Sequence, residues 1–156
     1  MKIRFVRPKK GEAVFHGRQH TPLGTLAVAW SASGIRQIGF AKTRWPATRV
    51  LDGLGDPRSR KRWRVAVTGT PFQMAVWRAL VGIPFGATTT YGRLAAQLGK
   101  PGAARAVGQA VGANPVAVLV PCHRVVGANG RLGGYFWGPA CKRRLLRWEG
   151  GRGGGI

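Results

Sequence analysis

Apolar residues follow two different periods along this chain, one in each half. Residues 23–30 alternate and are rich in β-forming residues, the turn-forming residues 31–34 follow, and residues 35–40 continue as a second strand. This pattern predicts a β-hairpin. Residues 63–67 predict one further strand, whereas proline, glycine and arginine interrupt the pattern in residues 42–62 and predict a loop or linker. The first half of the chain is therefore expected to be β-rich.

Helical spacing replaces the alternation after residue 69. Between residues 72 and 80 the apolar residues recur on one helix face, and Pro71 fits the first position of that helix. Two shorter helices are expected over residues 90–98 and 103–111, joined by a glycine-containing turn. This arrangement is typical of a helix-turn-helix. A last helix is expected over residues 140–149.

The second helix of the expected pair has a surface of very small side chains. Alanine and glycine occupy six positions between residues 103 and 112, and Arg105 projects from among them. Such a helix can approach another backbone closely, either in a protein core or against DNA. Because an arginine is difficult to bury, we expect this helix to face DNA.

A short apolar run leads to the candidate nucleophile. Residues 116–120 predict a buried strand that ends directly before Pro121, Cys122 and His123. A cysteine held as a thiolate beside a histidine is a nucleophile, although a lone cysteine is more often an inert core residue. Glu149 is the only carboxylate after residue 69. It is either the partner that orients His123 or a charge on the surface.

The charge balance indicates a polyanionic partner. The chain of 156 residues carries 26 Lys and Arg against four Asp and Glu, a formal net charge of +22. This excess favours nucleic acid, although a generally basic solvated surface would have the same composition. No apolar run is long enough to span a bilayer, and the N-terminus lacks the apolar stretch of a signal peptide. With only two cysteines, we expect a bacterial cytoplasmic protein whose thiols are reduced.

The sequence offers little for a metal or a cofactor. His16 and His20 have a spacing that suits metal ligands on a helix, but no further Cys or His pair completes a site. Cys141 has no histidine nearby and is expected to be structural. The glycine-rich phosphate loops are absent. No metal and no cofactor are expected.

Several segments together resemble one family. Residues 121–126, Pro-Cys-His-Arg-Val-Val, are similar to the active-site signature of the O6-alkylguanine-DNA alkyltransferases, also called methylated-DNA–protein-cysteine methyltransferases. In the family's order, the similarity extends to residues 69–73, 76–77, 83–86, 91–92, 104–108, 114–115 and 148–150. Residues 134–138 are closer to the C-terminal domain of bacterial Ada. Residues 21–26 and 34–35 resemble the family's opening hairpin less strongly.

The resemblance implies a role for each residue near the nucleophile. Cys122 would accept the alkyl group, and His123 would deprotonate it through a water held by Glu149. Asn114 would tie the helix-turn-helix to the active-site strand.

The resemblance also implies how DNA is held. Tyr91 would contact the phosphate beside a flipped nucleotide and protonate the leaving guanine. Tyr135 would line the guanine pocket, and Arg105 would fill the gap left in the base stack. The helix of small residues would lie in the minor groove, and chemistry on a stacked base requires base flipping. The implied partner is double-stranded DNA containing alkylated guanine, bound by a monomer, with no membrane.

The expected fold is α/β. A small, abbreviated β-rich N-terminal domain would occupy residues 1–68, and a mostly helical DNA-binding and catalytic domain residues 69–150. A flexible tail would follow over residues 151–156. The stretch between residues 40 and 69 is shorter than in the family, and a helix is expected to be missing there.

The implied function is DNA repair by irreversible, stoichiometric transfer of an alkyl group from O6-alkylguanine to Cys122. O4-alkylthymine is a second candidate substrate. One alternative is a non-catalytic protein that flags alkylated guanine, against which the presence of Cys122 counts. Another is a cysteine enzyme acting on small molecules, which would need neither a helix-turn-helix nor an excess of basic charge.

Overall fold

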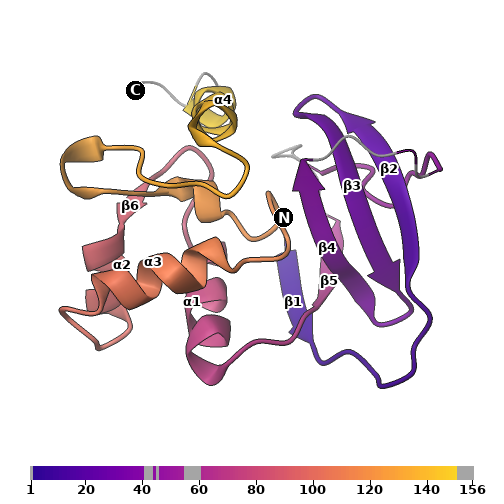
Figure 1. The fold of residues 1–156 in the computed structure, drawn as a ribbon, viewed down its shortest axis with the longest axis horizontal. Coiled ribbons are helices and arrows are strands. Elements are labelled where there is room, and N and C mark those ends of the chain that lie inside the picture. The colour runs from indigo at the N-terminus through magenta and orange to yellow at the C-terminus, as the bar shows by residue number, and fades with distance from the viewer. Residues whose placement is uncertain (1, 41–43, 45, 55–60, 151–156) are drawn as a thin grey trace. The chain divides into compact units, whose positions relative to one another are not determined.

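A computed structural model describes residues 2–40, 44, 46–54 and 61–150. The chain divides into two compact units, each described here by itself (Figure 1). The first unit comprises Met1–Thr68 and Pro115–Leu119, and the second comprises Gly69–Asn114 and Val120–Ile156. The tail expected over residues 151–156 lies outside the described residues, as do parts of the loop expected over residues 42–62.

The first unit is a five-stranded sheet in the order β1-β5-β4-β3-β2. Its strands are β1 (Lys2–Val6), β2 (Phe15–Thr21), β3 (Gly24–Ser31), β4 (Gly34–Phe40) and β5 (Arg62–Ala66). Strands β2, β3 and β4 are antiparallel neighbours, whereas β5 runs parallel to both β4 and β1. The predicted hairpin is confirmed as β3 and β4, and the predicted further strand as β5. In residues 44, 46–54 and 61–68 the structure contains no helix.

The two strands that the pattern did not predict, β1 and β2, are the edges of this sheet. Strand β2 is a partly solvated edge strand and does not carry the apolar alternation of a central strand, whereas β1 does alternate polar and apolar residues. Strand β2 contains both His16 and His20, whose spacing therefore belongs to a strand rather than a helix. Among the described residues no group of three or more His, Cys, Asp or Glu side chains is placed to hold a metal.

Gly34 lies in the turn between β3 and β4, at a position where a larger residue would not fit. Gly34 has φ +143°, and a Cβ at this position would collide with the backbone carbonyl of Arg64 on β5. The central strands then bury Leu26, Val28 and Ile38 completely. The tight turn at Gly34 therefore allows β4 to begin close against β5.

The prediction of a strand over residues 116–120 is wrong, although the predicted burial of these residues is confirmed. Only Val116 pairs with the sheet, in a single parallel bridge to Ile38. The chain then turns instead of extending: Leu119 N donates to Ala117 O over 2.8 Å, and Val118 has φ +69°. All five residues are at most 5% exposed. A short apolar run gives the same signal whether it is a strand or a buried turn, so periodicity cannot separate the two.

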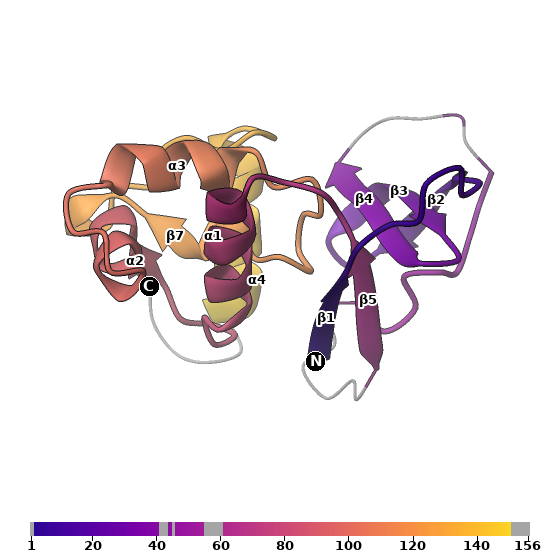
Figure 2. The same ribbon diagram turned by 90° about the horizontal axis from the view of Figure 1, so that it is seen from below.

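The second unit consists of four α-helices around two short parallel strands (Figure 2). The helices are α1 (Pro71–Val81), α2 (Tyr91–Gln97), α3 (Ala104–Gly112) and α4 (Pro139–Gly150). The strands are β6 (Thr89–Thr90) and β7 (Val125–Val126), and the 3-10 helices are η1 (Cys122–Arg124) and η2 (Ala128–Gly130). All four predicted helices are confirmed within two residues at each end.

The helix ends follow from local sequence chemistry. Thr70 and Gln73 form a capping box at the start of α1, and the Thr90 hydroxyl accepts from Arg93 N at the start of α2. Helices α2 and α3 form the predicted helix-turn-helix, with Gly99 and Gly102 at positive φ in the turn. No helix in the described part of the chain is long and apolar enough to cross a membrane.

Candidate active site

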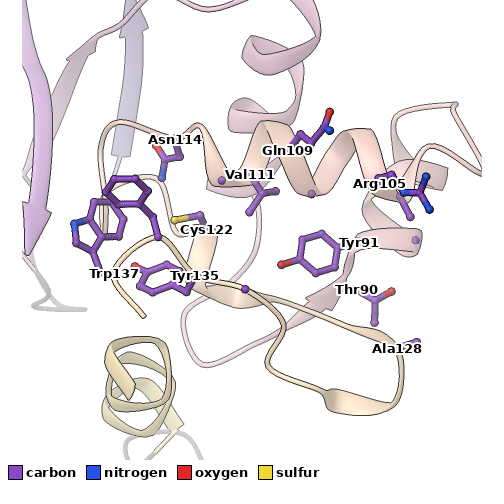
Figure 3. Close-up of a pocket in the computed structure, with 16 residues that line it drawn as sticks. Thr90, Tyr91, Arg105, Gln109, Val111, Asn114, Cys122, Ala128, Tyr135 and Trp137 are labelled. Carbon is purple, nitrogen blue, oxygen red and sulfur yellow. The ribbon is translucent and has the colours of Figure 1, made fainter. Parts of the chain in front are cut away.

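A cavity of about 810 Å³ opens in the second unit between α3 and the loop that precedes α4 (Figure 3). It brings together five of the predicted site residues: Tyr91, Arg105, Asn114, Cys122 and Tyr135. The remaining two, His123 and Glu149, do not line it but are buried and bonded to each other. The small residues of α3 also line this cavity, at Ala104, Gly108 and Gly112. The spacing of these three residues leaves one face of α3 nearly free of side-chain bulk.

Cys122 begins the 3-10 helix η1 directly after Pro121, rather than ending a strand. Its side chain is free of disulfides, only 3% exposed, and lines the cavity. Burial raises the pKa of the Cys122 thiol, while the Asn114 amide, the Tyr135 hydroxyl and the charge of Lys142 act in the opposite direction. The thiol is therefore surrounded by groups that favour the thiolate once a proton acceptor is available.

His123, the residue after Cys122, is held in one tautomer by a carboxylate. His123 Nε2 lies 2.8 Å from Glu149 Oε1. Because an ionised carboxylate can only accept, Nε2 carries the proton, and Nδ1 is left with a free lone pair. Burial lowers the pKa of His123, with Glu149 acting in the opposite direction, so the ring is neutral near pH 7. His123 is thus prepared to take up a proton at Nδ1.

The Glu149 carboxylate is hydrogen-bonded directly to the His123 ring. It is 2% exposed, so the interpretation of Glu149 as a surface charge is wrong. Four donors surround the carboxylate: His123 Nε2, Arg124 Nε, Arg124 Nη2 and Gly86 N, at 2.8 to 3.1 Å. Burial raises the pKa of Glu149, but these hydrogen bonds and charges outweigh it and lower the pKa to about 2.

Asn114 connects the end of α3 to the segment that carries the nucleophile. It is 5% exposed, and its Nδ2 donates to Val120 O over 2.8 Å. Since Asn114 also contacts the Cys122 thiol, one amide fixes both the backbone before the nucleophile and the sulfur itself.

Two tyrosines approach the sulfur from different elements (Figure 3). Tyr91 is the first residue of α2 and packs against Gly133, where a Cβ would lie 3.3 Å from the phenol oxygen. The Tyr135 hydroxyl lies beside the Cys122 sulfur without a well-formed hydrogen bond. Burial and the Cys122 charge raise the pKa of both phenols. Both therefore remain protonated donors at neutral pH.

Comparison with known proteins places this site in a family. The family model described as "6-O-methylguanine DNA methyltransferase, DNA binding domain" matches residues 71–151. The curated methylated-DNA–protein-cysteine methyltransferase of Methanosarcina acetivorans is 40% identical over 148 residues, covering 83% of this chain and 94% of that protein. The chain belongs to this methyltransferase family.

Other relatives match different lengths of the chain. The methylated-DNA–protein-cysteine methyltransferase of Salmonella typhimurium is 62% identical over 85 residues, 54% of this chain. The match spans 50% of that relative's own length. The crystal structure of Mycobacterium tuberculosis OGT in complex with DNA superposes with a TM-score of 0.75 and 37% identity. That superposition covers 88% of this chain and 93% of the other.

In this member of the family, two buried cations were missed by sequence reasoning. Arg124 holds Glu149 with two nitrogens and donates its third, Nη1, to Ile83 O over 2.6 Å. Lys142 is fully buried on α4, and its Nζ donates to Val125 O over 2.6 Å and to Leu132 O. Burial lowers the pKa of Lys142 to about 8, with Cys122 acting in the opposite direction. The sequence pattern does indicate that Lys142 is buried. It lies on the same face of α4 as Leu145, Leu146 and Glu149, and a charged residue is unusual on a buried helix face.

Lys142→Met is expected to lower the free energy of unfolding by about 2–6 kcal/mol. The substitution keeps the side-chain length but leaves two carbonyls, of Val125 and Leu132, without their donor, at about 1–3 kcal/mol each. Urea unfolding measures the loss. The exposed Arg143 on the same helix gives the matched control, Arg143→Met, which should change little. Equal stability of the two variants would contradict a structural role for the buried ammonium.

Arg105 is exposed on α3 and lines the cavity. Figure 3 shows it beyond Tyr91, at the far side of the cavity from Trp137. Its side chain is therefore accessible to a ligand that occupies the cavity, and it is not part of the core.

Proposed function

We propose that this protein repairs DNA by transferring the alkyl group of an O6-alkylguanine to the sulfur of Cys122, once per molecule. The observation that carries the proposal is a buried thiol that faces a cavity and adjoins a His123–Glu149–Arg124 network. Membership of the methyltransferase family supports the same chemistry. O4-alkylthymine is a second candidate substrate.

The reaction conserves atoms and charge. His123 Nδ1 takes the thiol proton through one bridging water, and the thiolate attacks the alkyl carbon. The bond between O6 and that carbon breaks as the sulfur–carbon bond forms. Tyr91 donates a proton to the leaving guanine, and the proton held by His123 returns to the phenol. The products are S-alkylcysteine and unmodified guanine, with no cofactor in the balance.

The DNA would be bound by the helix-turn-helix, with α3 in the minor groove and the damaged nucleotide flipped into the cavity. While the damaged base is stacked in the duplex, a buried thiol cannot reach its O6 atom. The base must therefore be extruded. The small residues Ala104, Gly108 and Gly112 allow α3 to approach the groove closely. We propose that the protein acts as a monomer in the cytoplasm, where its two free thiols stay reduced.

Incubation with a duplex containing O6-methylguanine should add the mass of one methyl group to the protein. Peptide mapping should place the methyl group on Cys122, because the other thiol, Cys141, lies outside the cavity. Cys122→Ala should gain no mass, and Cys141→Ala is the matched control that should react normally. A small-molecule enzyme would show continued turnover, and a protein that only flags the lesion would show no mass change. Either result would replace the proposed function.

A further inference from the structure

The first unit carries four basic side chains in one ordered array, which we call the basic ladder: Lys2, Arg4, Arg62 and Arg64. Strands β1 and β5 are parallel, and Lys2 pairs with Arg62 while Arg4 pairs with Arg64. Alternate residues of a strand face the same side, so the four cations project from one face. All four are exposed, whereas Trp63 and Val65 on the opposite side are buried.

The ladder borders a cavity of about 570 Å³, whose lining also includes Ile3, Val6 and Trp63 from outside the ladder. Neighbouring strands lie about 4.8 Å apart and alternate residues about 6.6 Å apart along a strand. The four cations therefore occupy neighbouring positions on the sheet, and all four border the same cavity.

No acidic side chain neutralises the ladder in the described part of the chain. Glu12 accepts from Ser31 and Ser33, and Asp52 accepts from Arg49 and Gln19. None of the ion pairs among the described residues includes a ladder cation. Like charges directly opposite each other on paired strands destabilise a sheet. Repulsion among these cations is reduced when an external anion binds to the ladder.

We propose that the basic ladder is a second nucleic-acid-binding surface, which contacts the phosphate backbone from outside the family's DNA-binding segment. The proposal rests on the proposed function in one respect: that function identifies the bound polyanion as DNA. Three of the four cations are arginines, which bind phosphate oxygens with two parallel N–H groups. A lipid surface fits less well, because the exposed large apolar residues of the described chain, Val14, Phe15 and Phe136, lie outside the ladder.

The test measures how the affinity of the full chain for a short undamaged duplex depends on salt. Each phosphate contact contributes about 0.9 to the slope of log K against log salt. Lys2→Gln, Arg4→Gln, Arg62→Gln and Arg64→Gln combined should reduce the slope by about 3.6. Between ~50 and ~200 mM salt, the wild type should therefore lose about 150-fold more affinity than this variant. The edge-strand double variant, Lys2→Gln with Arg4→Gln, should give about half the change in slope.

The matched control removes the same charge from four exposed positions outside the ladder: Lys9, Lys10, Arg143 and Arg147, each changed to Gln. Its slope should change less than that of the ladder variant. Equal changes in the two variants would overturn the proposal, as would ladder-dependent binding to vesicles containing phosphatidylserine with unchanged DNA binding. Methylation of Cys122 by free O6-methylguanine base should proceed alike in all variants, which shows that they are folded. A wild type that is never methylated would refute the proposed function, while the salt slope would still decide the ladder.

Discussion

Glu149→Gln is expected to slow alkyl transfer about 10²–10⁴-fold, the usual contribution of a positioned general base. The carboxylate fixes the proton on His123 Nε2 and stabilises the positive charge that the ring acquires when Nδ1 takes up a proton. A neutral amide of the same shape does neither reliably. Single-turnover methylation of Cys122, followed by mass spectrometry, measures the rate. Affinity for undamaged DNA should stay nearly the same, because Glu149 is buried away from the cavity lining.

The same substitution should affect stability in a pH-dependent way. Removing one partner of a buried ion pair costs about 3–5 kcal/mol, here because Arg124 loses its carboxylate. The pKa of Glu149 is lowered from 4.5 to about 2, so its stabilising contribution is complete above about pH 4.5 and is lost as the pH falls toward 2. The E149Q protein should lack this part of the acid transition.

A matched control for the loss of a carboxylate is Glu12→Gln in the first unit. Glu12 accepts hydrogen bonds from Ser31 and Ser33 and has no part in the cavity. Its substitution should leave the rate of transfer unchanged. A folded E149Q protein that reacts at the wild-type rate would show that His123 needs no carboxylate.

Arg105→Ala is expected to slow the repair of duplex DNA about 10- to 100-fold while leaving the reaction with free O6-methylguanine base unchanged. Extruding a guanine costs a few kcal/mol of stacking and pairing, and each 1.4 kcal/mol corresponds to a factor of ten. An arginine in the vacated space recovers part of that free energy without touching the reacting atoms. A single-stranded substrate should give an intermediate loss.

The control for this second prediction is Arg93→Ala, which removes an exposed arginine of α2 that does not line the cavity. It should weaken duplex binding slightly and leave the rate at saturating protein unchanged. If Arg105 were only a phosphate contact, its substitution would slow duplex and single-stranded substrates alike, and more protein would restore the rate. That outcome would contradict the role in base flipping.

Local chemistry made much of the fold predictable. The capping box at Thr70 and the glycines of the turn between α2 and α3 act within a few residues, so the sequence pattern was sufficient there. Strand β2 escaped prediction because this edge strand faces solvent and carries mixed polar residues, whereas the alternation of polar and apolar residues in β1 was in principle predictable. The buried turn at residues 116–120 escaped because its shape depends on the bridge to Ile38, a residue remote in the sequence.

In the candidate site, too, the features set by local sequence were predictable and those set by tertiary contacts were not. Cys122 and His123 are adjacent in a recognisable segment, and the single acid of the second half marked Glu149. That Arg124 and Gly86 also bind Glu149 depends on three segments meeting in space, at sequence separations of 25 and 63 residues. Pattern reasoning has no access to such distances. It singled out Cys122, His123 and Glu149 but left out the contacts of Arg124 and Lys142.

The order in which these residues are synthesised has a further consequence. Glu149 follows His123 by 26 residues and comes after every other predicted site residue along the chain. At about 5–20 residues per second, the ribosome adds Glu149 about 1–5 s after His123. The residues of α2 and α3 have by then already been synthesised. A message truncated before the last turn of α4 would therefore encode the helix-turn-helix without the carboxylate that binds His123 and Arg124.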